Sequence, residues 1–132
     1  LQELIYETNL TNQDIGERFF ELGINRTEEV FADSAEPKSI YEIYKMGFNI
    51  KPVLKGPDSI VNGIDVLKRY KLNVCRNSTN LQRELKHYKW KEDMNGKSLN
   101  VPIDKFNDLL DATRYGCVMK MGRKRRRMWV GK

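Results

Sequence analysis

The stretch Val30-Phe31-Ala32-Asp33-Ser34-Ala35-Glu36-Pro37-Lys38-Ser39-Ile40 decides the fold. Its first three residues are apolar and predict a short buried strand, and Asp33 follows directly at the end of that strand. Pro37 favours the first turn of a helix, which we expect over 38–46 and closed by Gly47. A further strand, expected over 48–54, would complete a β-α-β unit.

The same alternation continues in both directions along the chain. Gly23 ends the helix before this unit, Thr79 with Gln82 fits a capping box, and Asn95-Gly96 favours a tight hairpin turn. The remaining expected elements are strands at 1–7, 72–75, 88–91 and 99–101 and helices at 11–22, 60–67, 79–87 and 104–121. This order indicates an α/β layered fold with partly parallel strands.

Composition points to one globular domain. The chain has 132 residues, of which 39% are hydrophobic and 32% charged, and no apolar run approaches the roughly 20 residues of a membrane span. The start lacks a signal peptide and an initiating Met, so we expect a fragment of a longer protein. Cys75 and Cys117 form no C-x-x-C pair, which argues against zinc and favours two buried thiols in a reducing interior.

Charge is distributed unevenly along the chain. The net charge of +6 equals the charge of the tail 123–132, because residues 1–122 hold 18 basic and 18 acidic side chains. Residues 1–44 hold 3 basic and 10 acidic side chains, whereas 45–91 hold 11 basic and 3 acidic. An acidic site beside a basic surface would give this pattern, and so would ordinary solvated faces.

Three aspartates are candidates for chemistry. Asp33 stands at the carboxyl end of a strand, where open α/β sheets bind ligands, although a turn or helix cap explains it equally well. Asp108 and Asp111 lie three apart on the last expected helix, so they share a face that is either a metal site or a solvated charged surface. Divalent metal ions require hard oxygen ligands of this type, but three carboxylates are few for two ions.

Three segments in order resemble the nuclease domain of phage terminase large subunits. They are Ala32-Asp33-Ser34-Ala35-Glu36-Pro37-Lys38-Ser39-Ile40, Lys55-Gly56-Pro57-Asp58-Ser59-Ile60 and Asn107-Asp108-Leu109-Leu110-Asp111-Ala112-Thr113-Arg114-Tyr115. The resemblance implies an RNase H-like mixed sheet flanked by helices, and a site for two Mg²⁺ or Mn²⁺ ions that cuts concatemeric double-stranded DNA. It assigns Asp33 and Asp111 as metal ligands, and Asp108 as a further ligand or a residue that orients water.

The resemblance also implies what the chain lacks. The first acid and the first strands of the family would precede residue 1, so we expect an inactive isolated chain or an oligomer that covers an exposed sheet edge. No G-x-x-x-x-G-K-[ST] motif occurs, so ATP is not expected here. The implied partners are the ATPase domain, the small terminase subunit and the portal protein, in the cytoplasm of a bacterial host.

Basic residues are candidates for DNA binding. Lys55 and Gly56 precede a helix whose amides could accept a phosphate with help from Lys38, although a plain loop is an equal alternative. Arg114 lies on the same face of the last expected helix as Asp108 and Asp111. The tail 123–132, expected to be flexible and separate from a domain at 1–122, could bind phosphates or another packaging protein through Arg123, Lys124, Arg125, Arg126 and Arg127.

Two other functions remain open from the sequence. A non-catalytic module for DNA binding or packaging assembly would explain the basic segments. An RNase H-like junction resolvase would share the acidic residues but prefer branched DNA.

Overall fold

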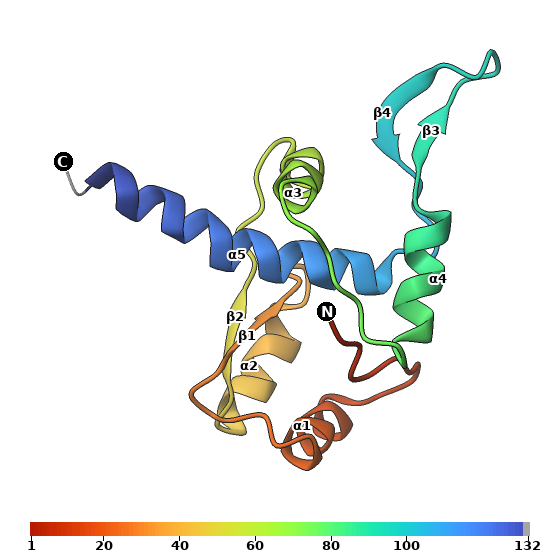
Figure 1. The fold of residues 1–132 in the computed structure, drawn as a ribbon. Coiled ribbons are helices and arrows are strands. Elements are labelled where there is room, and N and C mark those ends of the chain that lie inside the picture. Colours follow the sequence, from red (N-terminus) through yellow and green to blue (C-terminus); the bar gives the residue numbers. More distant parts are fainter. Residues whose placement is uncertain (131–132) are drawn as a thin grey trace.

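The structure, a computed structural model, describes the backbone of residues 1–130 and the side chains of residues 1–121. Figure 1 shows the long last helix running between two groups of elements. In chain order the elements are α1 (Asn12–Glu21), β1 (Glu29–Ala32), α2 (Pro37–Lys45), β2 (Asn49–Pro52), α3 (Ser59–Lys68), α4 (Thr79–His87), β3 (Trp90–Glu92), β4 (Ser98–Pro102) and α5 (Asp108–Val130).

The stretch around Asp33 folds as its sequence predicts. β1 and β2 are parallel, with Val30 opposite Ile50, and α2 connects them. Pro37 occupies the first turn of α2, and Gly47 has a φ of 98°, a conformation that glycine adopts without strain. The expected β-α-β unit is therefore confirmed.

The two faces of β1 contact different helices. Val30 and Ala32 pack against the buried cluster of Ile43, Phe48 and Ile50, which belongs to the side covered by α1 and α2. Phe31 points the other way, because side chains alternate along a strand, and Lys120 of α5 lies 5.8 Å from its ring centre. β1 is thus held between the helical pair and α5.

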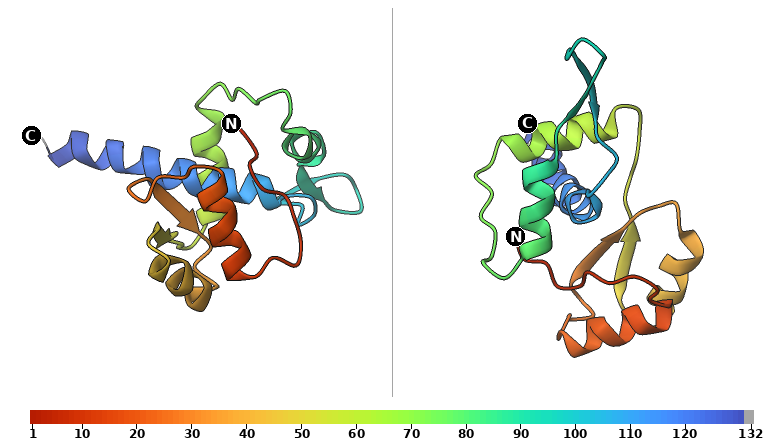
Figure 2. Two further views of the ribbon diagram at one scale, coloured as in Figure 1. Left: turned by 90° about the horizontal axis from the view of Figure 1, so that it is seen from below. Right: turned by 90° about the vertical axis from the view of Figure 1, so that its right-hand side faces the viewer.

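On the far side of α5 lie α3, α4 and the hairpin of β3 and β4 (Figure 2). The hairpin is antiparallel and forms a sheet separate from the parallel pair. Gly96 has a φ of 78° in its turn, as the Asn-Gly dipeptide predicts. The α/β class and the hairpin before the last helix are confirmed, with the parallel and antiparallel strands in two separate sheets.

Two expected strands are wrong. Segments 1–7 and 72–75 form no strand. The Leu1 carbonyl accepts from the Cys75 amide at 2.8 Å, and the Leu1 amino group donates to the Asn73 carbonyl at 2.5 Å. Two hydrogen bonds at one end are too few for a ladder. Cys75 is exposed and Cys117 is half-buried, so the burial expected of both thiols is also wrong.

Two helix ends differ from the expected ones. Thr11 caps α1 through a reciprocal pair of bonds with Asp14, whereas Ser78 rather than Thr79 precedes α4, without a side-chain cap. The last helix was expected to end at 121, yet α5 continues to Val130. The side chains of the basic residues at 123–127 lie outside the described residues, as does everything at 131–132.

None of the described helices is long and apolar enough to cross a membrane.

Candidate functional site

Asp33 follows β1 directly, and its carboxylate accepts three hydrogen bonds. Oδ1 accepts from the Ala35 amide at 2.9 Å and from Lys55 Nζ at 2.5 Å, and Oδ2 accepts from the Tyr115 hydroxyl at 3.2 Å. The bond from Lys55, then that from Ala35, lowers the pKa of Asp33 below its usual value. Asp33 is therefore both a turn residue and an ionised strand-end acid.

Tyr115 joins Asp33 to α5. It lies four residues after Asp111, so the two side chains are neighbours on one helix face. Lys55 Nζ lies 5.2 Å and Arg114 Cζ 4.7 Å from the centre of its ring. Tyr115 thus links the strand-end acid to the helix that also carries Asp111, a role that its place in the motif could have indicated.

Asp111 is held by an arginine of its own helix. Arg114 Nη2 lies 3.1 Å from Asp111 Oδ1, and Asn107 donates to the other carboxylate oxygen at 3.4 Å. Arg114 is only 5% exposed, and its buried Nε has no hydrogen-bond partner among the described residues. The sequence placed Arg114 on a DNA-binding surface, but this burial leaves it as a support for Asp111.

Asp108 occupies a different position. It is exposed in the first turn of α5 and borders an open cavity that Tyr6, Asn9 and Phe19 also line. The helix face expected to be shared by Asp108 and Asp111 therefore does not give them a shared ion pair, since among the side chains of residues 1–121 Arg114 pairs with Asp111 and not with Asp108. The proposed metal role of Asp108 stays a prediction.

Two carboxylates, which the sequence did not reveal, accept hydrogen bonds from the first turns of α4 and α5. Glu84 of α4 is 1% exposed, and its Oε2 accepts from the Leu110 amide at 2.9 Å, one of the unpaired donors at the start of α5. Glu3 accepts from the Asn80 amide at 2.9 Å at the start of α4. Glu84 therefore anchors the helix turn that carries Asp111.

The carboxylates suit a divalent ion only in part. Among the described residues there is no group of three or more His, Cys, Asp or Glu side chains that could hold a metal ion. Asp33 and Asp111 are the right ligand type for one ion completed by water, since Mg²⁺ keeps several waters. They do not by themselves fit a two-ion site.

Of the phosphate-binding candidates, Lys55 and Gly56 lie on the loop after β2, and Lys38 lies in the first turn of α2. Gly56 is exposed before α3, and Asp58 precedes that helix without a side-chain cap, so the first amides of α3 face no side-chain acceptor from Asp58. Lys38 is exposed, with its Nζ 3.9 Å from Glu42. Lys55 is turned toward Asp33 instead.

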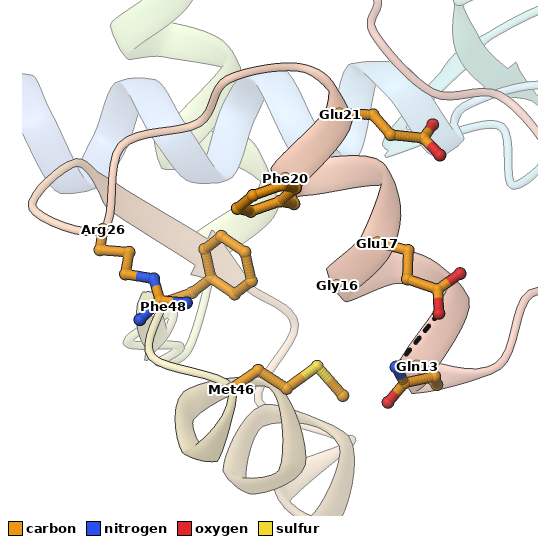
Figure 3. A pocket seen from close by; sticks show the side chains of 8 residues that line it. All are labelled: Gln13, Gly16, Glu17, Phe20, Glu21, Arg26, Met46 and Phe48. Carbon is orange, nitrogen blue, oxygen red and sulfur yellow. Dashed lines mark hydrogen bonds between the residues drawn. The ribbon is translucent and has the colours of Figure 1, made fainter.

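A separate open cavity of about 300 Å³ lies between α1 and the start of β2 (Figure 3). Phe20, Met46 and Phe48 form its apolar part, and Glu17 and Arg26 are among its polar residues. Neither Asp33 nor Asp111 lines it. The cavity is therefore not the candidate site.

Glu29 links β1, β2 and α5 through two lysines, and this predicts a pH dependence of stability. Its carboxylate accepts from Lys51 at 2.9 Å and Lys120 at 3.0 Å, and these bonds, that of Lys51 first, lower the pKa of Glu29 to about 2. A depressed pKa stabilises the fold above the unfolded pKa, and this contribution is lost as pH falls through the folded pKa. Glu29→Gln should thus lower the urea midpoint at about pH 6, modestly because both lysines are partly exposed, and lower it less at about pH 2. An equal loss at both pH values would refute this linkage.

Gly63 allows α3 to approach α5 closely and predicts a sensitive position. A Cβ there would lie 2.6 Å from Arg114 Cδ and closer still to Cγ. Gly63→Ala should therefore displace the arginine that holds Asp111 and cost about 1–3 kcal/mol in urea unfolding. Gly116→Ala in α5 is the matched control, because nothing lies within 4 Å of the added carbon. Equal stability of the two variants would contradict the tight contact.

Comparisons with known proteins agree with this fold. The family described as "Terminase RNAseH like domain" matches residues 1–117. The large terminase subunit of Bacillus phage SPP1 is 36% identical over 91 residues, which cover 65% of this chain and 21% of that protein. The chain thus spans about a fifth of that relative. The crystal structure of the large terminase nuclease domain from bacteriophage SPP1 with bound Mn matches with a TM-score of 0.77 at 25% identity, over 88% of this chain and 67% of that one.

Proposed function

Because the chain belongs to the family of terminase RNase H-like domains, we propose that it is a metal-dependent endonuclease domain that cuts double-stranded DNA during phage DNA packaging. The match confirms the resemblance that three short motifs indicated and the RNase H-like fold. Cleavage of concatemeric DNA by this chain is part of the proposal.

The contact of Tyr115 with Asp33 carries the proposal. It joins the acid at the end of β1 to the helix that bears Asp111, at 3.2 Å from hydroxyl to carboxylate. A strand-end acid and a helix acid in this relation supply hard oxygen ligands from two elements. Arg114 and Glu84, both buried, hold the helix acid in place.

A divalent ion would supply an activated water and stabilise charge on the scissile phosphate. The matching SPP1 nuclease domain has bound Mn, so we propose Mg²⁺ or Mn²⁺ for this chain, held by Asp33 and Asp111, with Asp108 as a further candidate. Hydrolysis with two ions would need oxygen ligands beyond these two acids. Tyr115 and Arg114 would orient the carboxylates.

DNA would approach the edge where the loops after β1 and β2 meet. We propose that Lys38, Lys55, Gly56 and the first amides of α3 contact phosphates there, with sequence-independent affinity that falls as salt rises. We also propose 1–122 as the nuclease domain and 123–132 as a basic tail that binds DNA or another packaging protein. The ATPase domain, small subunit and portal protein are the partners proposed from the family, in the cytoplasm of the bacterial host.

The test is cleavage of supercoiled plasmid DNA by the chain with Mn²⁺, together with the Mn²⁺ affinity measured from free Mn²⁺ by electron paramagnetic resonance. Asp33→Asn and Asp111→Asn should each reduce both, whereas Asp65→Asn, an acid of α3, should change neither. Cleavage and Mn²⁺ binding that persist in both site variants would refute the nuclease assignment.

A non-catalytic packaging module is the second candidate, and the structure offers one observation in its favour. Both acids carry a cation of the protein itself, Lys55 on Asp33 and Arg114 on Asp111. Such a module would bind DNA with salt dependence and no response to metal. A junction resolvase would instead cut branched DNA faster than linear duplex in a side-by-side assay.

A further inference from the structure

The two site acids differ in how their cations are held. Arg114 is buried, lies across Gly63 of α3 and shares a helix with Asp111. Lys55 lies on the loop after β2, and its side chain is 37% exposed. Arg114 cannot leave Asp111 without breaking the packing of α3 on α5, whereas Lys55 can rotate into solvent.

We propose that Lys55 is a displaceable counter-cation, which occupies Asp33 until a divalent ion replaces it and then becomes available to a DNA phosphate. The inference rests on the proposed function, because it takes Asp33 as a metal ligand. It assigns Lys55 a regulatory role that couples metal binding to DNA binding.

The bonds on Asp33 show what an ion would replace. Ala35 and Tyr115 donate through an amide and a hydroxyl, which are neutral donors fixed by the turn and by α5. Lys55 supplies the one positive charge among the three donors, at 2.5 Å from Oδ1. A divalent ion at that oxygen would meet a like charge at contact distance, so the ammonium group must move.

The released ammonium group has a suitable destination. Lys55 directly precedes Gly56 and lies four residues before Ser59, the first residue of α3, where backbone amides without a side-chain cap and the helix dipole favour an anion. Metal binding at Asp33 would thereby add a cation to the phosphate-binding surface. By linkage, DNA would in turn strengthen metal binding by the same factor.

Lys51 provides a matched control. It makes the same kind of contact, to Glu29 at 2.9 Å, and its side chain is 42% exposed, close to that of Lys55. Replacing either lysine with methionine removes one positive charge and one ion pair. The two variants differ in whether the carboxylate that loses the lysine belongs to the candidate site, and Glu29 keeps its bond to Lys120 in Lys51→Met.

The first experiment measures the Mn²⁺ dissociation constant of the 132-residue chain by electron paramagnetic resonance. Lys55→Met should tighten Mn²⁺ binding by about two- to fivefold, the range for a partly exposed ion pair, whereas Lys51→Met should leave it unchanged. Unchanged or weaker binding in Lys55→Met overturns the inference. Asp33→Asn serves as the reference, since Mn²⁺ binding that survives it overturns the proposed function itself.

The second experiment measures affinity for a short DNA duplex by fluorescence anisotropy at constant ionic strength. Ca²⁺ replaces Mn²⁺ here because it takes the same oxygen ligands. Ca²⁺ should tighten DNA binding by about two- to fivefold in the wild type and in Lys51→Met, and far less in Lys55→Met. An equal response of Lys55→Met and wild type would exclude the coupling.

Discussion

Arg114→Met is expected to destabilise the domain by about 2 kcal/mol and to weaken divalent-metal binding. Breaking a buried ion pair costs more than this when both partners are buried, but the Asp111 side chain is 32% exposed, so solvent screens part of the loss. The remaining cost comes from the contact of Arg114 with α3 at Gly63. Urea unfolding followed by circular dichroism measures the change.

A double-mutant cycle separates the ion pair from the packing. Asp111→Asn in the Arg114→Met background removes the uncompensated carboxylate, so the double variant should be more stable than the sum of the single losses predicts. Arg83→Met, which removes an exposed arginine of α4, is the control and should change stability by less than about 0.5 kcal/mol. A loss for Arg114→Met as small as that of the control would show that Arg114 does not support Asp111.

Glu84→Ala is expected to cost about 2–3 kcal/mol, because it leaves the Leu110 amide without its buried acceptor. Glu84→Gln keeps an oxygen for that amide and should lose less. Besides lowering the stability of the whole domain, Glu84→Ala should loosen the first turn of α5. Amide hydrogen exchange should therefore speed up most in that turn. Glu92→Ala, at an exposed position of β3, is the control.

The same variant tests the link to the site. If Glu84 positions the turn that carries Asp111, Mn²⁺ affinity should fall in Glu84→Ala under conditions where the protein remains folded, and Glu84→Gln should restore most of it. Mn²⁺ affinity equal to wild type in folded Glu84→Ala would limit Glu84 to a role in stability.

Local patterns predicted the elements that depend on neighbouring residues. The apolar run into Asp33, Pro37 and Gly47 specified β1, α2 and their boundaries because each acts within a few residues. The expected strand at 72–75 failed because a strand needs a partner, and the choice of partner depends on residues far along the chain. The expected end of the last helix at residue 121 was wrong, because no proline follows to stop the helix and α5 continues to Val130.

The sequence predicted the acids of the site but not the residues that contact them. Asp33 and Asp111 carry the motif, whereas the bond of Tyr115 to Asp33 spans 82 positions and arises only when α5 packs on β1. The role of Glu84 could not be predicted, because a helical glutamate that accepts from the start of another helix looks in the sequence like any other helical glutamate. Lys55 was expected on phosphate, and its contact with Asp33 was visible only in the structure.

The central claim is that Asp33 and Asp111 serve one metal site, and a double-mutant cycle on Mn²⁺ affinity tests it most directly. Measured by electron paramagnetic resonance, Asp33→Asn and Asp111→Asn should each weaken binding by at least about tenfold, and the double variant should be little weaker than either. Losses that multiply in the double variant, or a single variant that binds as wild type does, would show that the two acids do not share an ion.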